Sequence, residues 1–435
     1  MNHSSKSPAE NHGRRTFLKT AAAAAPVLGT PIVRGQEAAA DEREVRIGIV
    51  GAGGRGTGAL NDSLSINDHV KVVAVADLTE QKGQRLRDIL GRRHEGKVAI
   101  DDTAIHTGLD GYQHVLEDPN VDLVIFATPP GFRPRHIAEA VQAGKHVFAE
   151  KPTCVDPAGY RICLAAHAEA EKRGTAIVTG TQYRRQINYM EAVQQIRDGA
   201  IGDIVSATSR YCSTGIWFKN RPEGMSDTEY QIFNWMHYVW LSGDQIAEQA
   251  VHNIDTMNWV MGGAPESAYG SGGRFTRPET SEMWDSMSID YVYPGNRTLS
   301  FMCRQIPGST GDNSNTIYGT AGIAHIGAMS QGSRITDRNG REIWSQQGRI
   351  SDAYKQEHKD LVDSIRAGRP IVELRQTAES SLTAVLGRMA AYTGRRVTWD
   401  FVTEQSQLDL YPEALDWTAA RPESRHAVPG QTKLV

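Results

Sequence analysis

Two acidic side chains and a histidine recur at helical spacing in the segment 245–261. Glu248, His252 and Asp255 stand at positions i, i+4 and i+7, so we expect them to share one face of a helix. A carboxylate one turn before a histidine can orient the imidazole and raise its basicity, which suits removal of a hydroxyl proton. The alternative is an exposed Glu–His pair with no catalytic role. Residues with apolar side chains follow the same period on another face: Ile246, Ala250, Ile254, Met257 and Met261.

Lys151 is the second residue whose position favours chemistry. It lies in Glu150-Lys151-Pro152, directly after the predicted strand 146–149. Ligands of open parallel sheets bind beyond the carboxyl ends of the strands. An ammonium group there can polarise a substrate oxygen and hold it during hydride transfer. The residue before proline favours an extended backbone, and the Lys151–Pro152 bond is a candidate for the cis form. The alternative is a surface lysine in an ordinary turn.

A glycine-rich turn indicates what accepts the hydride. The apolar run 45–50 predicts a buried strand, and Gly51, Gly53 and Gly56 follow with the spacing G-x-G-x-x-G. In this motif the glycines permit a tight turn, close approach of a pyrophosphate and close helix packing. The helix N-terminus then offers N–H groups to the phosphates. The residues between these glycines, Gly54 and Arg55, are expected to line the same cofactor site. The alternative is a glycine-rich turn in another parallel-sheet protein.

An acidic residue at the end of the second predicted strand favours NAD as the cofactor. Asp77 follows the strand 70–76 and lies 21 residues after Gly56, where its carboxylate is placed to accept from the adenine-ribose hydroxyls. Its charge would repel a 2′-phosphate, so NADP is the less favoured cofactor.

A stretch rich in aromatic residues precedes the Glu248 segment. Between Trp217 and Trp240 the chain has three tryptophans together with Tyr230, Phe233 and Tyr238. Aromatic faces stack on the C–H faces of sugar rings, so the stretch is a candidate lining for a carbohydrate site. An aromatic core or a subunit contact is an equal alternative.

The pattern of predicted elements divides the chain into two domains. Strands and helices alternate over 44–181, which predicts an α/β domain with a parallel sheet. Over 182–400 consecutive strands with short turns predict an α+β domain with a large open antiparallel sheet. The predicted helices are 77–93, 134–143, 157–173, 187–197, 245–261, 354–367 and 377–392; later strands are 121–127, 175–179, 204–211, 285–293, 297–305, 316–326 and 333–337. Residues 401–435 are expected to form an irregular tail.

Composition excludes several classes of function. A length of 435 residues is too great for one hydrophobic core. The net charge of −4 provides no basic field for nucleic acid. Four scattered cysteines make no disulfide framework, and none of the 14 histidines lies in a zinc-binding pattern, so no metal is expected.

The N-terminus has the pattern of a targeting segment. Arg14 and Arg15 precede an apolar stretch, 20–33, that is too short for a stable membrane anchor. Residues 1–40 are therefore expected to be a twin-arginine signal, with possible cleavage near the small residues 38–40. The protein would be exported folded, to the periplasm or another extracytoplasmic space. An unprocessed tail is the alternative.

These motifs together resemble the Gfo/Idh/MocA oxidoreductases. The resemblance rests on the glycine turn, on 143–147 (Ala-Gly-Lys-His-Val), on Glu150-Lys151-Pro152 and on Glu248-x-x-x-His252, and it covers nearly everything after residue 44. It implies a Rossmann domain followed by an open sheet that often mediates homo-oligomers. It also implies that Lys151 is the catalytic lysine and His252 the acid/base. The resemblance further implies two sets of contacts. The cofactor would be held by Gly51, Gly53, Gly56, Asp77, Thr128, Glu150 and Lys151. The substrate would be held by Lys151, Arg184, Glu248 and His252.

Two residues depart from the family pattern. The carboxylate before the histidine is usually Asp and here is Glu248, one methylene longer. A histidine usually found a few residues after the Thr-Pro pair is replaced by Arg133. These changes put the geometry near both loops in question.

The sequence therefore predicts an exported NAD-dependent oxidoreductase that acts on CH–OH groups of a sugar, sugar acid or cyclitol. One alternative is an enzyme that recycles tightly held NAD, oxidising a sugar transiently so that a glycosidic bond breaks by elimination. Relatives with that chemistry usually lack the lysine at the position of Lys151, which argues against it. A non-catalytic sugar- or cofactor-binding protein on the same fold is the second alternative.

Overall fold

The computed structural model describes residues 43–421 and 424–435. The predicted signal, residues 1–40, lies outside these ranges. Within them, no helix is both long enough and apolar enough to cross a bilayer.

Six strands form a parallel sheet in the first part of the described chain, in the order β3-β2-β1-β4-β5-β6. Its elements are β1 (Val45–Val50), α1 (Gly54–Ile66), β2 (Val70–Asp77), α2 (Glu80–Arg93), β3 (Ile105–Thr107), α3 (Gly111–Glu117), β4 (Leu123–Phe126), α4 (Arg133–Gln142), β5 (His146–Ala149), α5 (Pro157–Arg173) and β6 (Ile177–Thr179). This is the strand order of a Rossmann domain, and it confirms the predicted fold class. The order reverses between β1 and β4, so the loops after β1, β4 and β5 meet at one edge.

The central strands of this sheet are apolar because helices cover both of their faces. β4 (Leu-Val-Ile-Phe) is entirely buried, and β1 is buried except at Arg46. Such continuous apolar runs are characteristic of parallel sheets, so they were predictable from the sequence.

Nine strands form the second sheet of the described residues, in the order β14-β13-β12-β11-β7-β10-β9-β8-β15. They are β7 (Ile204–Ser213), β8 (Ser267–Gly273), β9 (Ser286–Tyr293), β10 (Arg297–Gln305), β11 (Asp312–Gly319), β12 (Gly322–Gly327), β13 (Ser333–Asp337), β14 (Glu342–Gln346) and β15 (Val397–Thr398). All neighbours pair antiparallel except β10 and β7, which are parallel. The sheet is therefore mixed but mostly antiparallel.

The structure corrects several predicted elements. The run 316–326 is two strands, β11 and β12, which pair with each other across the turn at Thr320 and Ala321. The predicted helix 245–261 is two helices, α9 (Asp244–Glu248) and α10 (Val251–Met261). Four strands, β3, β8, β14 and β15, were not predicted because they are short, glycine-rich or partly exposed.

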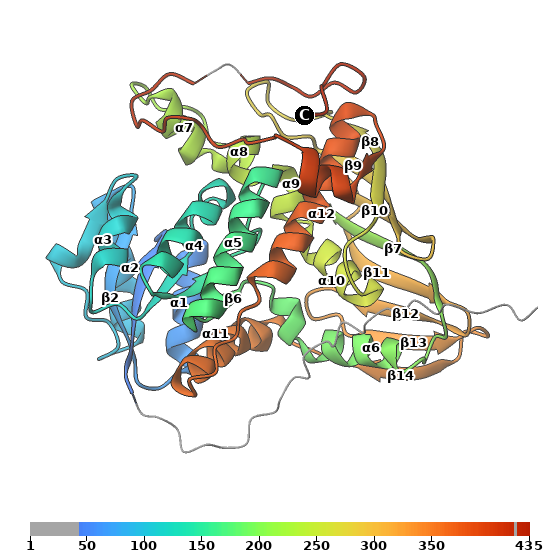
Figure 1. Cartoon of the computed structure of the whole chain (residues 1–435), viewed down its shortest axis with the longest axis horizontal. Helices are drawn as coiled ribbons and strands as arrows, with labels where there is room; N and C mark the ends of the chain where they lie inside the picture. The colour runs from blue at the N-terminus through green and yellow to red at the C-terminus, as the bar shows by residue number, and fades with distance from the viewer. Residues whose placement is uncertain (1–42, 422–423) are drawn as a thin grey trace, which may run out of the picture. The chain divides into compact units, whose positions relative to one another are not determined.

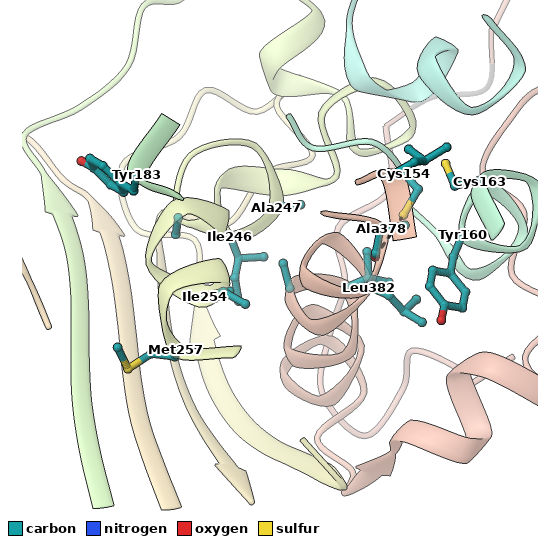
Figure 2. Close-up of a cluster of buried hydrophobic side chains, with 14 of the residues drawn as sticks. Cys154, Tyr160, Cys163, Tyr183, Ile246, Ala247, Ile254, Met257, Ala378 and Leu382 are labelled. Carbon is teal, nitrogen blue, oxygen red and sulfur yellow. Dashed lines mark hydrogen bonds between the residues drawn. The ribbon is translucent and has the colours of Figure 1, made fainter. Parts of the chain in front are cut away.

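Two late helices connect the sheets. The helix α11 (Ile350–Arg366) packs against α1 and β5 of the Rossmann sheet, and α12 (Leu374–Thr393) packs against α5, α10 and β8. Figure 2 shows Ala378 and Leu382 of α12 between Cys154, Tyr160 and Cys163 on one side and Ile246 and Ile254 on the other. These buried side chains belong to one continuous cluster, so α9 and α10 are held against the Rossmann part through α12.

The remaining helices lie around the sheets: α6 (Ile187–Arg197), α7 (Asp227–Phe233) and α8 (Val239–Ser242). After β15 a π-helical turn, Phe401–Gln405, precedes a tail that extends along α7 and α8 (Figure 1). Tyr411 of the tail packs edge-on against Phe132 and Trp240. Tyr230, Tyr238 and Trp240 are buried in this cluster, so much of the aromatic stretch is core, as the alternative interpretation proposed.

Candidate active site

The glycine turn after β1 has the shape that a pyrophosphate needs. Gly51 has a φ of +99°, and a Cβ there would lie 2.8 Å from the carbonyl carbon of Ala127. A Cβ on Gly56 would lie 1.9 Å from the Gly51 oxygen, so α1 packs directly on the turn. A Cβ on Gly53 would meet nothing within 4 Å, and the N-terminal turn of α1 begins there. Two glycines thus shape the turn, and the third leaves room for a dinucleotide.

Replacing Gly56 with alanine is expected to raise the dissociation constant for NAD at least about tenfold, because the new methyl group forces α1 away from the turn. Gly58→Ala is the matched control, since its Cβ has no neighbour closer than 4.0 Å and alanine favours the helix. Isothermal titration of both variants with NAD measures the difference. Equal affinities would show that the turn does not hold the cofactor.

Asp77 ends β2 beside this turn. Its carboxylate accepts from the Ala52 N–H at 2.7 Å and from Lys82 Nζ at 2.9 Å. The first bond ties the end of β2 to the glycine turn. The carboxylate therefore has a fixed place at the predicted adenosine end of the site, and its unused lone pairs can accept from hydroxyl groups.

Arg55 and Glu150 form an ion pair across the same edge. Arg55 Nε donates to Glu150 Oε1, and the guanidinium lies 4.5 Å from the ring centre of Tyr354. Burial alone would raise the pKa of Glu150, but the charges of Arg55 and Arg133 lower it below its usual value. A second buried carboxyl, Glu357, lies 3.8 Å from Arg55 NH2, and burial together with the charge of Glu150 raises its pKa well above its usual value. Arg55 thus connects the glycine turn with β5 and α11.

Lys151 contacts Glu248 at the break between α9 and α10, where one continuous helix was predicted. Lys151 Nζ donates to the Glu248 carbonyl oxygen and lies 3.3 Å from Glu248 Oε1. The Glu248 carbonyl is available because the helix is interrupted there: the Ala250 N–H bonds back to Gln245 O, five residues earlier. The bond between Lys151 and Pro152 is cis.

Tertiary contacts on both helices explain the interruption. At the start of α9, Asp244 accepts from the Trp284 N–H at 3.0 Å, and Gln245 Nε2 donates to Trp284 O at 2.9 Å. On α10, Asn253 Nδ2 donates to Arg210 O at 2.8 Å. The start of α9 is thus fixed to the segment before β9, and α10 is fixed separately to β7. Helical periodicity alone does not contain this information.

His252 is the second residue of α10, and part of the residue is exposed. Its partial burial, together with the charges of Lys151 and Arg55, lowers the pKa of His252 well below its usual value. The imidazole is therefore neutral and able to accept a proton. Its ring lies edge-on to Tyr183, with centres 5.5 Å apart. Within the described residues Glu248 is paired with Lys151 rather than with His252, contrary to the expected Glu–His arrangement.

Three tyrosines around these groups were missed by the sequence analysis. Tyr183 contacts His252, Tyr354 lies under Arg55, and the Tyr211 hydroxyl donates to Gln249 Oε1 at 3.2 Å. Burial raises the pKa of each hydroxyl, so all three stay neutral. They come from a 3-10 turn, from β7 and from α11, and no spacing in the sequence connects them.

The loop after β4 is held by Arg133. Thr128 follows β4, and its carbonyl accepts from Arg133 at 2.6 Å. The Thr128 hydroxyl lies 3.3 Å from His136 Nδ1. Arg133 also donates to the carbonyls of Lys151 and Pro152, so the arginine that replaces the usual histidine connects the loop after β4 to the loop after β5.

Arg184, the predicted substrate contact, is paired with Asp255 of α10. Its guanidinium forms two hydrogen bonds to Asp255, at 2.9 and 2.8 Å, and a third to Gln376 at 3.3 Å. Asp255 also accepts from Ser380 on α12. These contacts connect the segment after β6 to α10 and α12, which favours a structural role. Its predicted contact with substrate stays a prediction.

Replacing Arg184 with methionine is expected to lower the free energy of unfolding by about 3 kcal/mol, because the buried Asp255 carboxylate loses its partner. The double variant Arg184→Met with Asp255→Asn should recover part of the loss. Urea denaturation of the three proteins measures the effect. A large rise in KM without loss of stability would instead support the substrate-binding role.

The described residues contain no group of three or more His, Cys, Asp or Glu side chains arranged to hold a metal ion. Three features lie at the edge of the Rossmann sheet: the neutral imidazole of His252, Lys151 paired with Glu248, and the glycine turn with room for a phosphate.

Sequence profiles of known families match both halves of the chain. The profile described as "Oxidoreductase family, NAD-binding Rossmann fold" matches residues 45–178, and that of the GFO/IDH/MocA C-terminal domain matches 189–325. Among curated relatives, myo-inositol 2-dehydrogenase of Thermotoga maritima is 21% identical over 338 residues, which are 75% of this chain and 90% of the relative. For three further relatives the match covers 61%, 54% and 54% of their own length.

Two other comparisons bear on function and fold. A glycosyl hydrolase family 109 protein of Stenotrophomonas maltophilia is 31% identical over 206 residues, which are 46% of this chain and 42% of the relative. The solved structure of levoglucosan dehydrogenase with NADH and levoglucosan has a TM-score of 0.65 at 16% identity, covering 82% of this chain and 99% of that one. The structural likeness shows the fold, and the two profiles together span more than half of the chain. The protein therefore belongs to the Gfo/Idh/MocA family, as an oxidoreductase with an NAD-binding Rossmann domain.

Proposed function

We propose that this protein oxidises, or in reverse forms, a secondary hydroxyl of a sugar, sugar acid or cyclitol with NAD. One observation carries the proposal: Lys151, at the carboxyl end of a Rossmann strand, contacts Glu248 of the second domain beside a neutral His252. This is the edge of the sheet to which the glycine turn directs a dinucleotide.

Side chains of this protein remove the hydroxyl proton of the substrate and hold the substrate oxygen. Bound NAD supplies the acceptor for the hydride that leaves the carbinol carbon. The Lys151 ammonium holds the substrate oxygen and stabilises the negative charge that develops on it. His252, being neutral, takes the hydroxyl proton at a ring nitrogen as the C=O bond forms. Glu248 accepts from Lys151 and so fixes the direction of the ammonium group. The products are a ketone, NADH and a protonated imidazole.

The substrate class rests on the relatives. Those named inositol dehydrogenases act on cyclitols, and a structural neighbour was solved with an anhydrosugar. The test is a panel of aldoses, sugar acids and inositols incubated with the purified protein and NAD, with NADH absorbance as the readout. Mass spectrometry of the denatured protein, purified after native export, would identify a retained cofactor. A protein that neither contains nor binds NAD or NADP would refute the proposal.

A second candidate is cleavage of a glycosidic bond with recycled NAD. The 31% identity to a glycosyl hydrolase family 109 protein favours it, although the match covers less than half of either chain. Lys151 argues against it for the reason given above. Release of sugar from an aryl glycoside without added NAD would support this candidate over the first.

Export and assembly complete the proposal. The twin-arginine pattern at Arg14 and Arg15 would send the folded protein out of the cytoplasm, and the second sheet would mediate a homo-oligomer. Cell fractionation with Arg14→Lys and Arg15→Lys, and light scattering of the purified protein, test these two points.

A further inference from the structure

Arg133 is a buried arginine that bonds only to main-chain carbonyls. It is the first residue of α4 and is 5% exposed. Its guanidinium donates to Lys151 O at 2.5 Å, to Pro152 O at 2.8 Å and to Thr128 O at 2.6 Å. Within residues 43–421 and 424–435, no carboxylate lies within ion-pair distance of it.

This arrangement is costly for folding alone. A buried cation normally has a carboxylate partner, because desolvation of the charge is only partly offset by neutral acceptors. Burial lowers the pKa of Arg133 to about 10, although the more distant charges of Glu150 and Glu248 act in the opposite direction. An apolar side chain of similar size would fill the same space without the cost of desolvating a charge. The bonds to the carbonyls are what an apolar side chain could not supply.

The three carbonyls belong to the two loops that build the site. Thr128 follows β4, and Lys151 and Pro152 follow β5, the neighbouring strand. Arg133 therefore fixes the loop predicted to contact the cofactor relative to the loop that carries Lys151.

A second buried arginine braces the other side of the Lys151 loop. Arg388 of α12 donates to Val155 O and to Gly243 O, each at 2.8 Å. Gly243 precedes α9, the helix that ends at Glu248. The loop after β5 is thus held at both sides by guanidinium groups, and its Lys151 meets Glu248 between them.

We propose that Arg133 is a positioning residue that sets the place of Lys151 by holding the Thr128, Lys151 and Pro152 carbonyls together. This inference rests on the proposed function only in treating Lys151 as the group that holds the substrate oxygen. Arginine is required because its planar fork reaches several carbonyls at once, whereas lysine presents a single point of charge.

The test compares Arg133→Lys and Arg133→Met with the full-length wild-type protein. We expect kcat to fall by about 100-fold in both variants, because displacing the Lys151 ammonium by about 1 Å has an effect of that size. KM for substrate and the affinity for NAD should change by less than about threefold, because the groups that bind them remain. Arg185→Lys is the matched control: it alters an arginine whose side chain is 10% exposed and pairs with Asp360 and Glu373 instead of the site loops.

A readout that does not need turnover separates this inference from the proposed function. Competitive acetylation with acetic anhydride, followed by peptide mass spectrometry, gives the reactivity of Lys151 as a function of pH, with exposed Lys172 as internal reference. In both Arg133 variants, and not in Arg185→Lys, Lys151 should react at least about fivefold faster because its loop opens. A role in stability alone would lower Tm in all three variants and leave the reactivity of Lys151 in the folded protein unchanged.

Unchanged Lys151 reactivity and unchanged kcat in a folded Arg133→Met protein would overturn the inference. Faster acetylation of Lys151 in the Arg133 variants of a protein whose wild type oxidises no sugar or cyclitol would support the positioning role and refute the proposed function. The variant Arg133→His, which restores the usual family residue, should behave like Arg133→Met, because imidazole cannot reach three carbonyls.

Discussion

Lys151→Met should lower kcat by about 10²–10³-fold, the usual effect of removing one group that stabilises charge at the reacting oxygen. Methionine keeps much of the apolar part of the lysine side chain, so the fold and the position of Glu248 at the end of α9 should be preserved. The affinity for NAD should stay within about threefold, because the glycine turn and Asp77 are untouched. Steady-state kinetics with the best substrate, and titration with NAD, measure the two effects.

Lys172→Met is the control for this prediction. Lys172 lies on α5, pairs only with Glu169 nearby and is 78% exposed in its side chain, so its loss should not change kcat. If wild-type turnover persists at full rate in Lys151→Met, the mechanism assigned above is wrong. A protein that binds NAD and sugar but shows no turnover in the wild type would instead be the non-catalytic alternative.

His252→Asn should lower kcat by about 10²–10⁴-fold, since a positioned general base contributes that range. In the wild type the active form is the neutral imidazole, and burial with the charges of Lys151 and Arg55 lowers its pKa well below its usual value. Activity in the oxidation direction should therefore persist as pH falls through the ordinary histidine range and decline only below it. The kcat/KM of the free enzyme as a function of pH measures this acidic limb.

The acidic limb should disappear in His252→Asn. His325→Asn, a change on β12 in the second sheet, should keep both the rate and the limb. A wild-type acidic limb that stays in place in His252→Asn would assign the proton transfer to another group.

The Rossmann part could be predicted from the sequence because its signals are local. The strand before Gly51, the spacing to Gly56 and the acidic residue at the end of β2 each reflect constraints within a few residues of chain. Buried parallel strands also have continuous apolar runs, which are easy to identify. The same holds for Lys151, whose place after β5 follows from the order of the elements alone.

The pairing within the site depended on tertiary structure. Helical spacing placed Glu248 with His252, but contacts of Asp244 and Gln245 with Trp284 interrupt the helix and turn Glu248 to Lys151. Arg184, the predicted substrate contact, is paired with Asp255, a partner that no spacing in the sequence indicated.

By itself, the sequence determined the Rossmann domain, its cofactor turn and the identity of the residues able to do chemistry. Only the tertiary structure decided which of them meet: it brought Lys151 to Glu248, Tyr183 to His252 and Arg133 to two loops. The reason is physical. A turn or a buried strand is specified by neighbours in the chain, whereas a side chain's partner is chosen by packing among elements that are distant in sequence.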